Sequence, residues 1–127
     1  MKSNTKEIGL AAESLVCAVL EKKGYLFIEK NFSWKGGEID LVFKESSATI
    51  KGLDTLVFVE VRSAKLKSSF LRYSIQLAKQ RRLERTIATF LHMRPWFRVF
   101  ARRFDVVWVE GTVIEHWKNV LILTSGR

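Results

Sequence analysis

Apolar residues recur every three or four positions over residues 5–23 and predict the first helix of this chain. They form one stripe on a helical surface: Ile8, Ala12, Leu15, Val16 and Val19. Gly24 follows the stripe and is a suitable terminator, because glycine readily adopts the left-handed conformation that ends many helices. The pattern predicts an amphipathic helix that packs this stripe against a core.

Three apolar segments bounded by polar or glycine-rich residues follow this helix and predict strands. The segments are residues 25–29, 38–44 and 55–62, separated by a turn over residues 33–37 and a polar connection over residues 45–54. The third segment contains four consecutive apolar residues, as expected of a central strand that is buried on both faces.

A second, longer helix is predicted over residues 71–93, after a loop over residues 63–70. It is expected to end at Arg94, because the residue before a proline is biased out of the helical region. Short strands are predicted at residues 103–109, 112–115 and 120–123. The order of helix, three strands, helix and further strands indicates a single α/β or α+β domain over residues 1–127, with a mixed sheet.

The composition is that of a folded domain. Hydrophobic residues make up 47% and charged residues 28% of the 127 residues, which excludes a disordered chain. No apolar run reaches the roughly 18 residues that a membrane-spanning helix needs. The polar N-terminal segment is unlike a secretion signal, so a cytoplasmic location is expected. Cys17 is the only cysteine, which excludes a disulfide within the chain and a cysteine-based zinc site.

The balance of charge narrows the choice of partner. Lys and Arg number 22 against 13 Asp and Glu, a formal net charge of +9. Such an excess favours nucleic acid, because each phosphate that is neutralised releases condensed counterions. The competing interpretation is a basic surface without a specific ligand. A membrane surface is not expected, since no basic amphipathic segment stands apart from the globular pattern.

Two acidic residues lie in segments that are otherwise typical of a sheet interior. Glu60 follows Phe58 by two positions and shares its face of the strand, and Arg62 shares that face again. Asp40 is expected to share one face of its strand with Glu38 and Val42, and Ile39, Leu41 and Phe43 are expected on the other face. If the two strands are neighbours, both carboxylates meet at one edge of the sheet. The alternative is a plain ion pair between Glu60 and Arg62 at a strand end.

Converging carboxylates beside a cation suit metal-dependent chemistry on phosphodiesters. Carboxylate oxygens are hard ligands that favour Mg²⁺ or Mn²⁺. The metal lowers the pKa of its bound water and neutralises charge on the phosphate, and Arg62 can stabilise the pentavalent state. Glu13 borders the apolar stripe of the first helix and is a third candidate ligand, pointing either into the same cleft or into solvent.

The long helix and the segments around it supply candidate contacts to substrate. Gln76 and Lys79 lie on one helical face and can contact phosphate or water. The candidates for nucleic-acid binding are basic residues of the turn, the loop and the helix: Lys35, Lys65, Lys67, Arg72, Arg81 and Arg85. Arginines that only keep the helix soluble are the alternative. Among the tryptophans, Trp34 beside the Gly-Gly turn is the favoured base-stacking candidate, and Trp108 is expected in the core.

Several motifs resemble the bacterial YraN family of uncharacterised, endonuclease-like proteins. The likeness covers nearly the whole chain in the same order, and it rests on Gly9, Glu13, Asn31, Gly36–Leu41, Leu56–Arg62, Lys79 with Arg82 and Leu83, Arg103–Val107 and His116–Asn119. It implies a restriction-endonuclease-like α/β fold, with a central mixed β-sheet flanked by helices. It also implies similarity to archaeal Holliday-junction resolvases, which carry a PD-(D/E)xK active site and an added glutamate in the first helix.

The resemblance implies a role for each candidate residue. Asp40 and Glu60 are expected to be catalytic metal ligands for Mg or Mn, with Val61 offering its carbonyl, and Glu13 takes the part of the helix-borne glutamate. Gln76 and Lys79 occupy positions where such enzymes keep polar groups. The expected substrate is branched or single-stranded DNA in repair or recombination, rather than RNA. A homodimer is expected by analogy, since paired strands need paired cuts.

Two departures from the motif leave the function open. The loop over residues 63–70 lacks the glycine often found there and carries Lys65 and Lys67 instead. Arg62 stands where the triplet usually has lysine, and arginine cannot serve as a general base, although it can still stabilise a phosphorane. The first hypothesis is a metal-dependent nuclease. The second is a non-catalytic nucleic-acid-binding adaptor with a weakened site, which recruits a helicase or a recombination partner. An RNA-directed module of ribosome metabolism is a third alternative, which basicity alone does not separate from these two.

Overall fold

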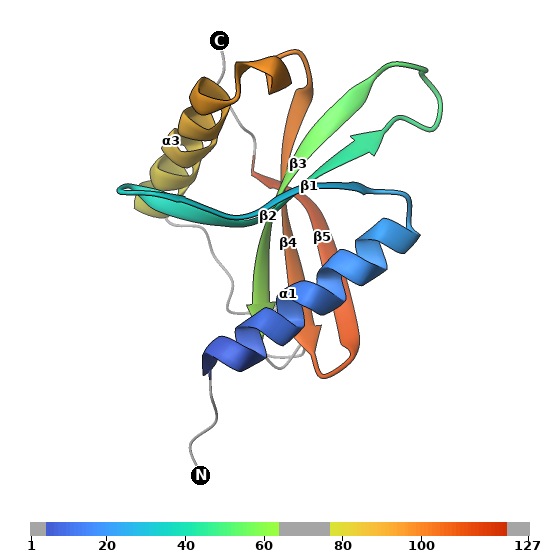
Figure 1. The fold of residues 1–127 in the computed structure, drawn as a ribbon, viewed down its shortest axis with the longest axis vertical. Coiled ribbons are helices and arrows are strands. Elements are labelled where there is room, and N and C mark those ends of the chain that lie inside the picture. Colours follow the sequence, from blue (N-terminus) through green and yellow to red (C-terminus); the bar gives the residue numbers. More distant parts are fainter. Residues whose placement is uncertain (1–4, 64–76, 122–127) are drawn as a thin grey trace.

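A five-stranded sheet with one helix on each face forms the body of the protein in a computed structural model, which describes residues 5–63 and 77–121 (Figure 1). The strands follow one another across the sheet in chain order: β1 (Leu26–Trp34), β2 (Gly37–Ser46), β3 (Asp54–Ser63), β4 (Ala101–Glu110) and β5 (Val113–Leu121). The helices are α1 (Thr5–Lys22), α3 (Leu77–Met93) and a short 3-10 turn, η1 (Pro95–Phe97).

The sheet is mixed, as the order of elements predicted. Strands β3 and β4 run parallel, and every other neighbouring pair is antiparallel. A parallel pair needs a long crossover, and the segment between β3 and β4 contains α3. The α/β class expected from the sequence is therefore confirmed, and the arrangement is consistent with a restriction-endonuclease-like fold.

Separate apolar cores hold the two helices against the sheet. On one face, Val16 and Leu20 of α1 pack with Phe43 and Val57. On the other face, Phe90 of α3 packs against β3 and β1. The centre of its ring is 5.4 Å from that of Phe58 and 5.2 Å from that of Phe32, and both contacts are edge-on. Residues Leu56 to Val59 are completely buried. The prediction of a central strand covered on both faces is confirmed.

The edge strands were predicted less well, because both are irregular. Strand β1 continues to Trp34 instead of ending near residue 29, and the turn expected over residues 33–37 is confined to residues 35 and 36. Strand β5 is one strand through Leu121 where two short pieces were expected. Both pairings contain a bulge or register shift, and Asn31 and Asn119 adopt positive φ angles of 54° and 55°. Bulges interrupt the two-residue period by which strands are recognised in a sequence.

A buried ionic network fastens the irregular strand β5 to β4. Asp105 is fully buried and accepts hydrogen bonds from Arg103, from His116 Nε2 at 2.7 Å and from the backbone N–H of Asn119 at 2.9 Å. Arg103 also donates to Glu45 at 2.6 Å. Sequence analysis found no role for His116, since its partner is eleven positions away on another strand. The network satisfies the amide that the left-handed Asn119 would otherwise leave unpaired.

A side-chain hydrogen bond joins the tip of the β1–β2 hairpin to α3. The indole N–H of Trp34 donates to Thr86 Oγ1 at 2.9 Å, and the hydroxyl of Thr86 donates to the carbonyl of Arg82 at 2.8 Å. A Cβ atom added to Gly36 would lie 2.3 Å from the Trp34 ring, and one added to Gly37 would lie 2.5 Å from Thr86 Oγ1. Glycine is therefore required at both positions for the hairpin to approach the helix this closely.

Replacing Thr86 by valine tests this attachment. We expect the free energy of unfolding to fall by about 1–3 kcal/mol, because valine keeps the shape but leaves the half-buried Trp34 N–H without its acceptor. Urea unfolding monitored by circular dichroism measures the change. Thr89→Val is the matched control: Thr89 donates the same kind of bond one turn back on the helix, to the carbonyl of Arg85, but that bond is exposed to solvent. Equal losses in the two variants would contradict a role for the Trp34 bond.

Candidate functional site

The candidate site begins where β2 separates from β3. The two strands are paired from Ser46 and Asp54 as far as Leu41 and Val59, and beyond that point β2 stays paired with β1 alone. Figure 1 shows the β1–β2 hairpin leaving the sheet and turning toward α3. Asp40 is the first residue after the separation. Its carboxylate Oδ2 accepts the backbone N–H of Val61 at 2.8 Å and so replaces the lost strand partner.

The separation also changes which face the β2 side chains occupy. Ile39 was expected beside Leu41 and Phe43, and this expectation is wrong. Ile39 belongs to the α3-side core together with Val42, whereas Leu41 and Phe43 belong to the α1-side core. The alternation is therefore interrupted at Asp40, opposite the left-handed Asn31 on β1. This local change of direction is what a regular period of two could not predict.

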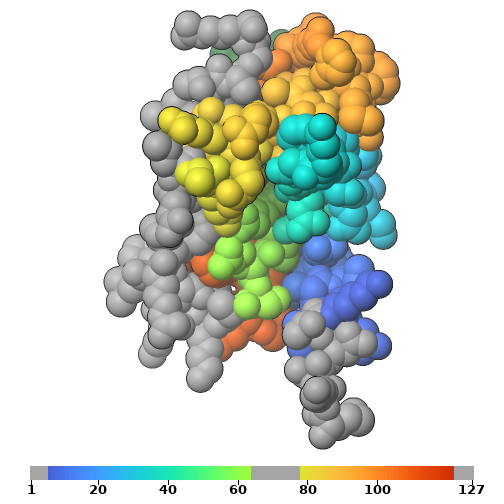
Figure 2. Space-filling view, turned by 90° about the vertical axis from the view of Figure 1, so that its left-hand side faces the viewer, coloured from blue at the N-terminus to red at the C-terminus, as the bar shows by residue number. Residues whose placement is uncertain are grey.

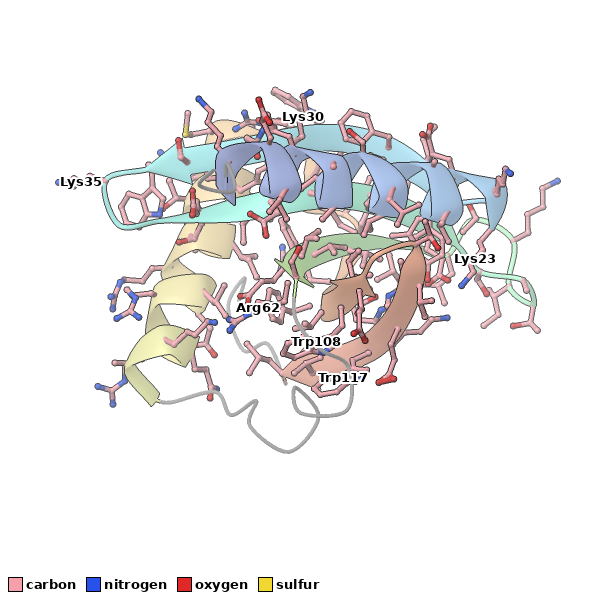
Figure 3. The ribbon with its side chains drawn as sticks, turned by 90° about the horizontal axis from the view of Figure 1, so that it is seen from below. Lys23, Lys30, Lys35, Arg62, Trp108 and Trp117 are labelled. Atoms are coloured by element: carbon pink, nitrogen blue, oxygen red, sulfur yellow. The ribbon has the colours of Figure 1, made fainter. Side chains whose placement is uncertain are left out.

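Glu60 lies one residue past the last position of β3 that pairs with β2, in the part of β3 that pairs with β4 alone, and it is bound by two cations. Arg62 Nη1 lies 2.9 Å from Oε2, and Lys79 Nζ of α3 lies 3.2 Å from both carboxylate oxygens. The ion pair with Arg62 that the sequence offered as an alternative interpretation is thus present, and Lys79 adds a second. Figure 3 shows Arg62 between α3 and the strand ends, close to Trp108, whose ring centre is 5.6 Å from the guanidinium.

Asp40, Glu60 and these cations line one cleft of about 440 Å³. Its walls come from the hairpin tip, the end of β3 and the first turns of α3, which meet on the face seen in Figure 2 (cyan, light green and yellow). Arg82 also lines the cleft, although the sequence reasoning did not single it out. The available signal was its helical spacing of three residues from Lys79, which places the two side chains on one side of α3.

The electrostatics of the cleft disfavour an ionised Asp40. Burial raises the pKa of Asp40 above its usual range, and the negative charges of Glu60 and Glu38 raise it further. The hydrogen bond from Val61 and the positive charge of Arg62 act in the opposite direction without cancelling the effect. The two carboxylates are thus near enough to repel one another, and a cation between them would be stabilised.

Glu13 lines a different hollow. It borders a space of about 370 Å³ between α1 and the hairpin, together with Cys17, Glu21 and Lys30. Burial raises the pKa of Glu13, and the charge of Asp40 contributes to the rise, so the two groups influence each other. Within residues 5–63 and 77–121, no three His, Cys, Asp or Glu side chains are grouped as a metal site. The carboxylates that share the cleft with the cations are Asp40, Glu60 and Glu38.

The remaining candidates divide into three groups. Arg81 and Arg85 lie exposed on α3. Lys35 projects from the hairpin tip, away from Arg62 (Figure 3). Four candidates lie outside the described residues: Lys65, Lys67, Arg72 and Gln76. Trp34, the favoured stacking residue, instead anchors the hairpin through its hydrogen bond to Thr86, and Trp108 is buried as expected.

Fold and site together define an α/β protein whose mixed sheet opens a polar cleft where two strands part. No helix among the described residues combines the length and the apolar character needed to cross a bilayer. The chain belongs to the UPF0102 family: residues 12–109 match the family model described as "Uncharacterised protein family UPF0102". That match includes Asp40, Glu60, Arg62 and Lys79.

Individual relatives support the same assignment. The chain is 38% identical to a UPF0102 protein of Coxiella burnetii over 124 residues, which cover 95% of this chain and 97% of the relative. It is 41% identical to one from Ralstonia nicotianae (87% and 83% covered) and 36% identical to one from Clostridium perfringens (84% and 82% covered). These matches confirm the prediction that the chain belongs to a family of uncharacterised bacterial proteins, whereas the likeness to nucleases stays a prediction. The descriptions of these relatives contain no activity.

Proposed function

We propose that this protein is a Mg²⁺- or Mn²⁺-dependent nuclease that binds and cleaves branched or single-stranded DNA. The observation that carries the proposal is the shared cleft of Asp40 and Glu60, bordered by Arg62, Lys79 and Arg82. The basic side chains of the cleft suit an anionic substrate such as a phosphodiester. The acidic side chains suit a metal cation that takes part in the reaction. The net charge of +9 favours the same class of substrate.

The residues of the cleft fit a hard divalent cation. Both candidate ligands are carboxylates, the donors that Mg²⁺ and Mn²⁺ prefer. Burial is the main cause of the raised pKa of Asp40, and the negative charges of Glu60 and Glu38 add a contribution that a cation would neutralise. A bound metal would lower the pKa of a water molecule and withdraw charge from the phosphodiester.

The cations of the cleft have separate tasks in this proposal. Arg62, held against Trp108, is suited to bind a phosphate oxygen through its planar fork of donors. Lys79 of α3 lies 3.2 Å from the Glu60 carboxylate. The cleft therefore contains a lysine, although the Glu-Val-Arg triplet of β3 ends in Arg62. Lys79 therefore offers an ammonium group that can stabilise the charge of a reacting phosphate.

A cleavage panel tests the proposal. Purified protein is incubated with hairpin, four-way-junction, flap and single-stranded DNA in Mg²⁺, in Mn²⁺ and in chelator. We expect products from at least one branched or single-stranded substrate with a divalent cation, and none in chelator, because the carboxylates cannot activate water by themselves. An RNA strand of matched length is the competitor. Cleavage that persists in excess chelator would contradict the metal site.

A specific contact favours a second function, a nucleic-acid-binding adaptor without catalysis. Glu60 forms ion pairs with Arg62 and Lys79, so its negative charge is balanced without a bound metal. An adaptor would bind DNA with an affinity that falls steeply with salt, and would give no product with any divalent cation. The cleavage panel, repeated as a binding titration at several salt concentrations, separates the two functions.

A further inference from the structure

Trp96 presents a larger share of its surface to solvent than the other tryptophans. Its relative exposure is 65%, whereas Trp108 is 3% exposed. Trp34 and Trp117 are half-buried and donate their indole N–H groups to Thr86 and Glu115. Trp96 also differs in its position, since it lies on η1, immediately after the C-terminal end of α3.

Packing holds the Trp96 ring in place from one side. Its centre is 6.0 Å from that of Phe97, and Phe97 stacks at 5.9 Å and an angle of 19° on Phe90 in the buried core. Pro95 precedes the ring and restricts the backbone. A rigid aromatic surface with one face toward solvent loses little conformational entropy when a flat ligand stacks on it.

A basic surface leads from the cleft toward this ring. Among the side chains of α3 that the structure describes, the exposed ones are Ala78, Arg81, Arg82, Arg85, Ala88, His92 and Met93, and the arginines lie in the first half of the helix. Glu84 is the only acidic residue of the helix. Figure 2 shows α3 (yellow) continuing into the segment that contains η1 (orange) on the face where the hairpin tip and the end of β3 also lie.

We infer that α3 and η1 form a track for single-stranded nucleic acid, on which an unpaired base stacks against Trp96. This inference rests on the proposed function, since one end of the track is the cleft. Arg82 lines the cleft, Arg81 and Arg85 follow the phosphates along α3, and the ring of Trp96 receives a base. Every base has a π-face, so this contact has little sequence preference.

The observations favour a single strand over other occupants. A duplex keeps its base faces inside the stack, so Trp96 would add nothing to duplex binding. Along the track, Arg81 and Arg85 flank the acidic Glu84, and Arg98 follows Trp96 by two residues, so positive charges outnumber the negative one and complement phosphates. A protein partner would instead use the neighbouring exposed apolar residues Val99 and Met93 together with Trp96.

The length of α3 determines how long the strand must be. Its 17 residues span about 24 Å at about 1.5 Å per residue. A strand that starts in the cleft and keeps the duplex spacing of about 3.4 Å per nucleotide would need about seven nucleotides to cover that distance, and a more extended strand would need fewer. A strand of about two nucleotides bound at the cleft would not reach Trp96 even when it is extended.

Binding of thymidine oligonucleotides to wild-type protein and to Trp96→Ala tests the track. Strands of about 2 and about 16 nucleotides and a blunt duplex are titrated in chelator by fluorescence anisotropy; the longer strand equals the largest site of a single-strand-binding OB fold. We expect Trp96→Ala to bind the longer strand about 10-fold more weakly, the effect of losing one stacked base, with the short strand and the duplex unchanged. Trp96→Phe should recover part of the loss.

The matched control is Val99→Ala, which trims the most exposed apolar side chain of the same segment. It should bind all three ligands like the wild-type protein, and thermal melting should show that each variant is folded. Three results would overturn the inference: an unchanged affinity of Trp96→Ala for the longer strand, equal losses for all three ligands, or equal losses in Trp96→Ala and Val99→Ala. Because chelator excludes cleavage, a protein that stacks DNA but never cuts it would retain this inference and refute the proposed nuclease.

Discussion

Replacing Asp40 by asparagine is expected to reduce metal-dependent cleavage by about 1000-fold, which corresponds to the several kcal/mol that a bound metal contributes to transition-state stabilisation. Asparagine has the shape of aspartate, and its side-chain oxygen can still accept the N–H of Val61. It lacks the negative charge that a metal ligand must supply. The variant therefore separates the chemistry of Asp40 from its place in the fold, and single-turnover cleavage of the best substrate measures the loss.

The same variant should be no less stable than the wild-type protein. Burial raises the pKa of Asp40, so the folded protein holds this proton more tightly than the unfolded chain does. Stability therefore falls as the pH rises from the ordinary aspartate pKa through the raised one, and at neutral pH the ionised Asp40 destabilises the fold. Asparagine removes that penalty, and urea unfolding at neutral pH should give an equal or higher midpoint.

Glu38→Gln is the matched control for Asp40→Asn. Glu38 also lines the cleft and carries the same charge, but its side chain is exposed and is not a proposed ligand. It should keep most of the cleavage rate. If Asp40→Asn cleaves as fast as the wild-type protein, the metal site is assigned to the wrong residue. If Asp40→Asn loses activity only because it unfolds, the urea midpoint will show it.

Replacing Asp105 by asparagine is expected to lower the free energy of unfolding by about 3–5 kcal/mol, the largest loss among the variants proposed. The substitution removes the buried negative charge that binds the Arg103 guanidinium. Burial by itself would raise the pKa of Asp105. The hydrogen bonds from His116, Arg103 and the Asn119 backbone outweigh burial and lower it. The fully buried carboxylate is therefore a stabilising group in its ionised form, unlike Asp40.

The pH dependence gives Asp105 a distinct signature. A lowered pKa contributes stability that is present above the ordinary aspartate pKa of about 3.9 and is lost as the pH falls through the lower, folded-state value. In Asp105→Asn this acid-side loss should be smaller, and urea midpoints measured from neutral pH into the acid range test it.

Glu45→Gln serves as the comparison for Asp105→Asn. Glu45 also binds Arg103, and its pKa is lowered, but its side chain is 29% exposed. Removing its charge should therefore cost about 1 kcal/mol or less, as for ion pairs near the surface. Equal losses in the two variants would mean that the bond to Arg103 alone, and not the buried network around Asp105, stabilises this end of the sheet.

The elements predicted well from the sequence are those whose pattern is local. Leu56 to Val59 identified the central strand, because only a strand covered on both faces carries an uninterrupted apolar run of that kind. Pro95 marked the end of α3, because its ring is incompatible with a continuing helix. The stripe of α1 was correct at Ala12 and Val16, whereas Ile8 is 48% exposed near the free end of the helix.

The candidate site was predicted in part. Asp40 and Glu60 were singled out because each interrupts an apolar strand pattern, and they do line one cleft. Glu13 was placed in the same group through resemblance, yet it opens into another hollow. Arg82 and the exposed Trp96 were not singled out, since a basic residue or a tryptophan has the same local appearance whether it faces a cleft, the core or solvent.

The sequence by itself determined the secondary structure of the central elements, the α/β class and the chemistry available on each strand, because these depend on neighbouring residues and their period. Tertiary structure alone decided three things: the parting of β2 from β3 at Asp40, the approach of Lys79 to Glu60, and the pairing of Asp105 with His116. The first and third depend on strand register and on a bulge or left-handed residue, and the second depends on how α3 packs on the sheet. A single irregular position reverses the direction of the side chains that follow it, and no regular period in the chain records that change.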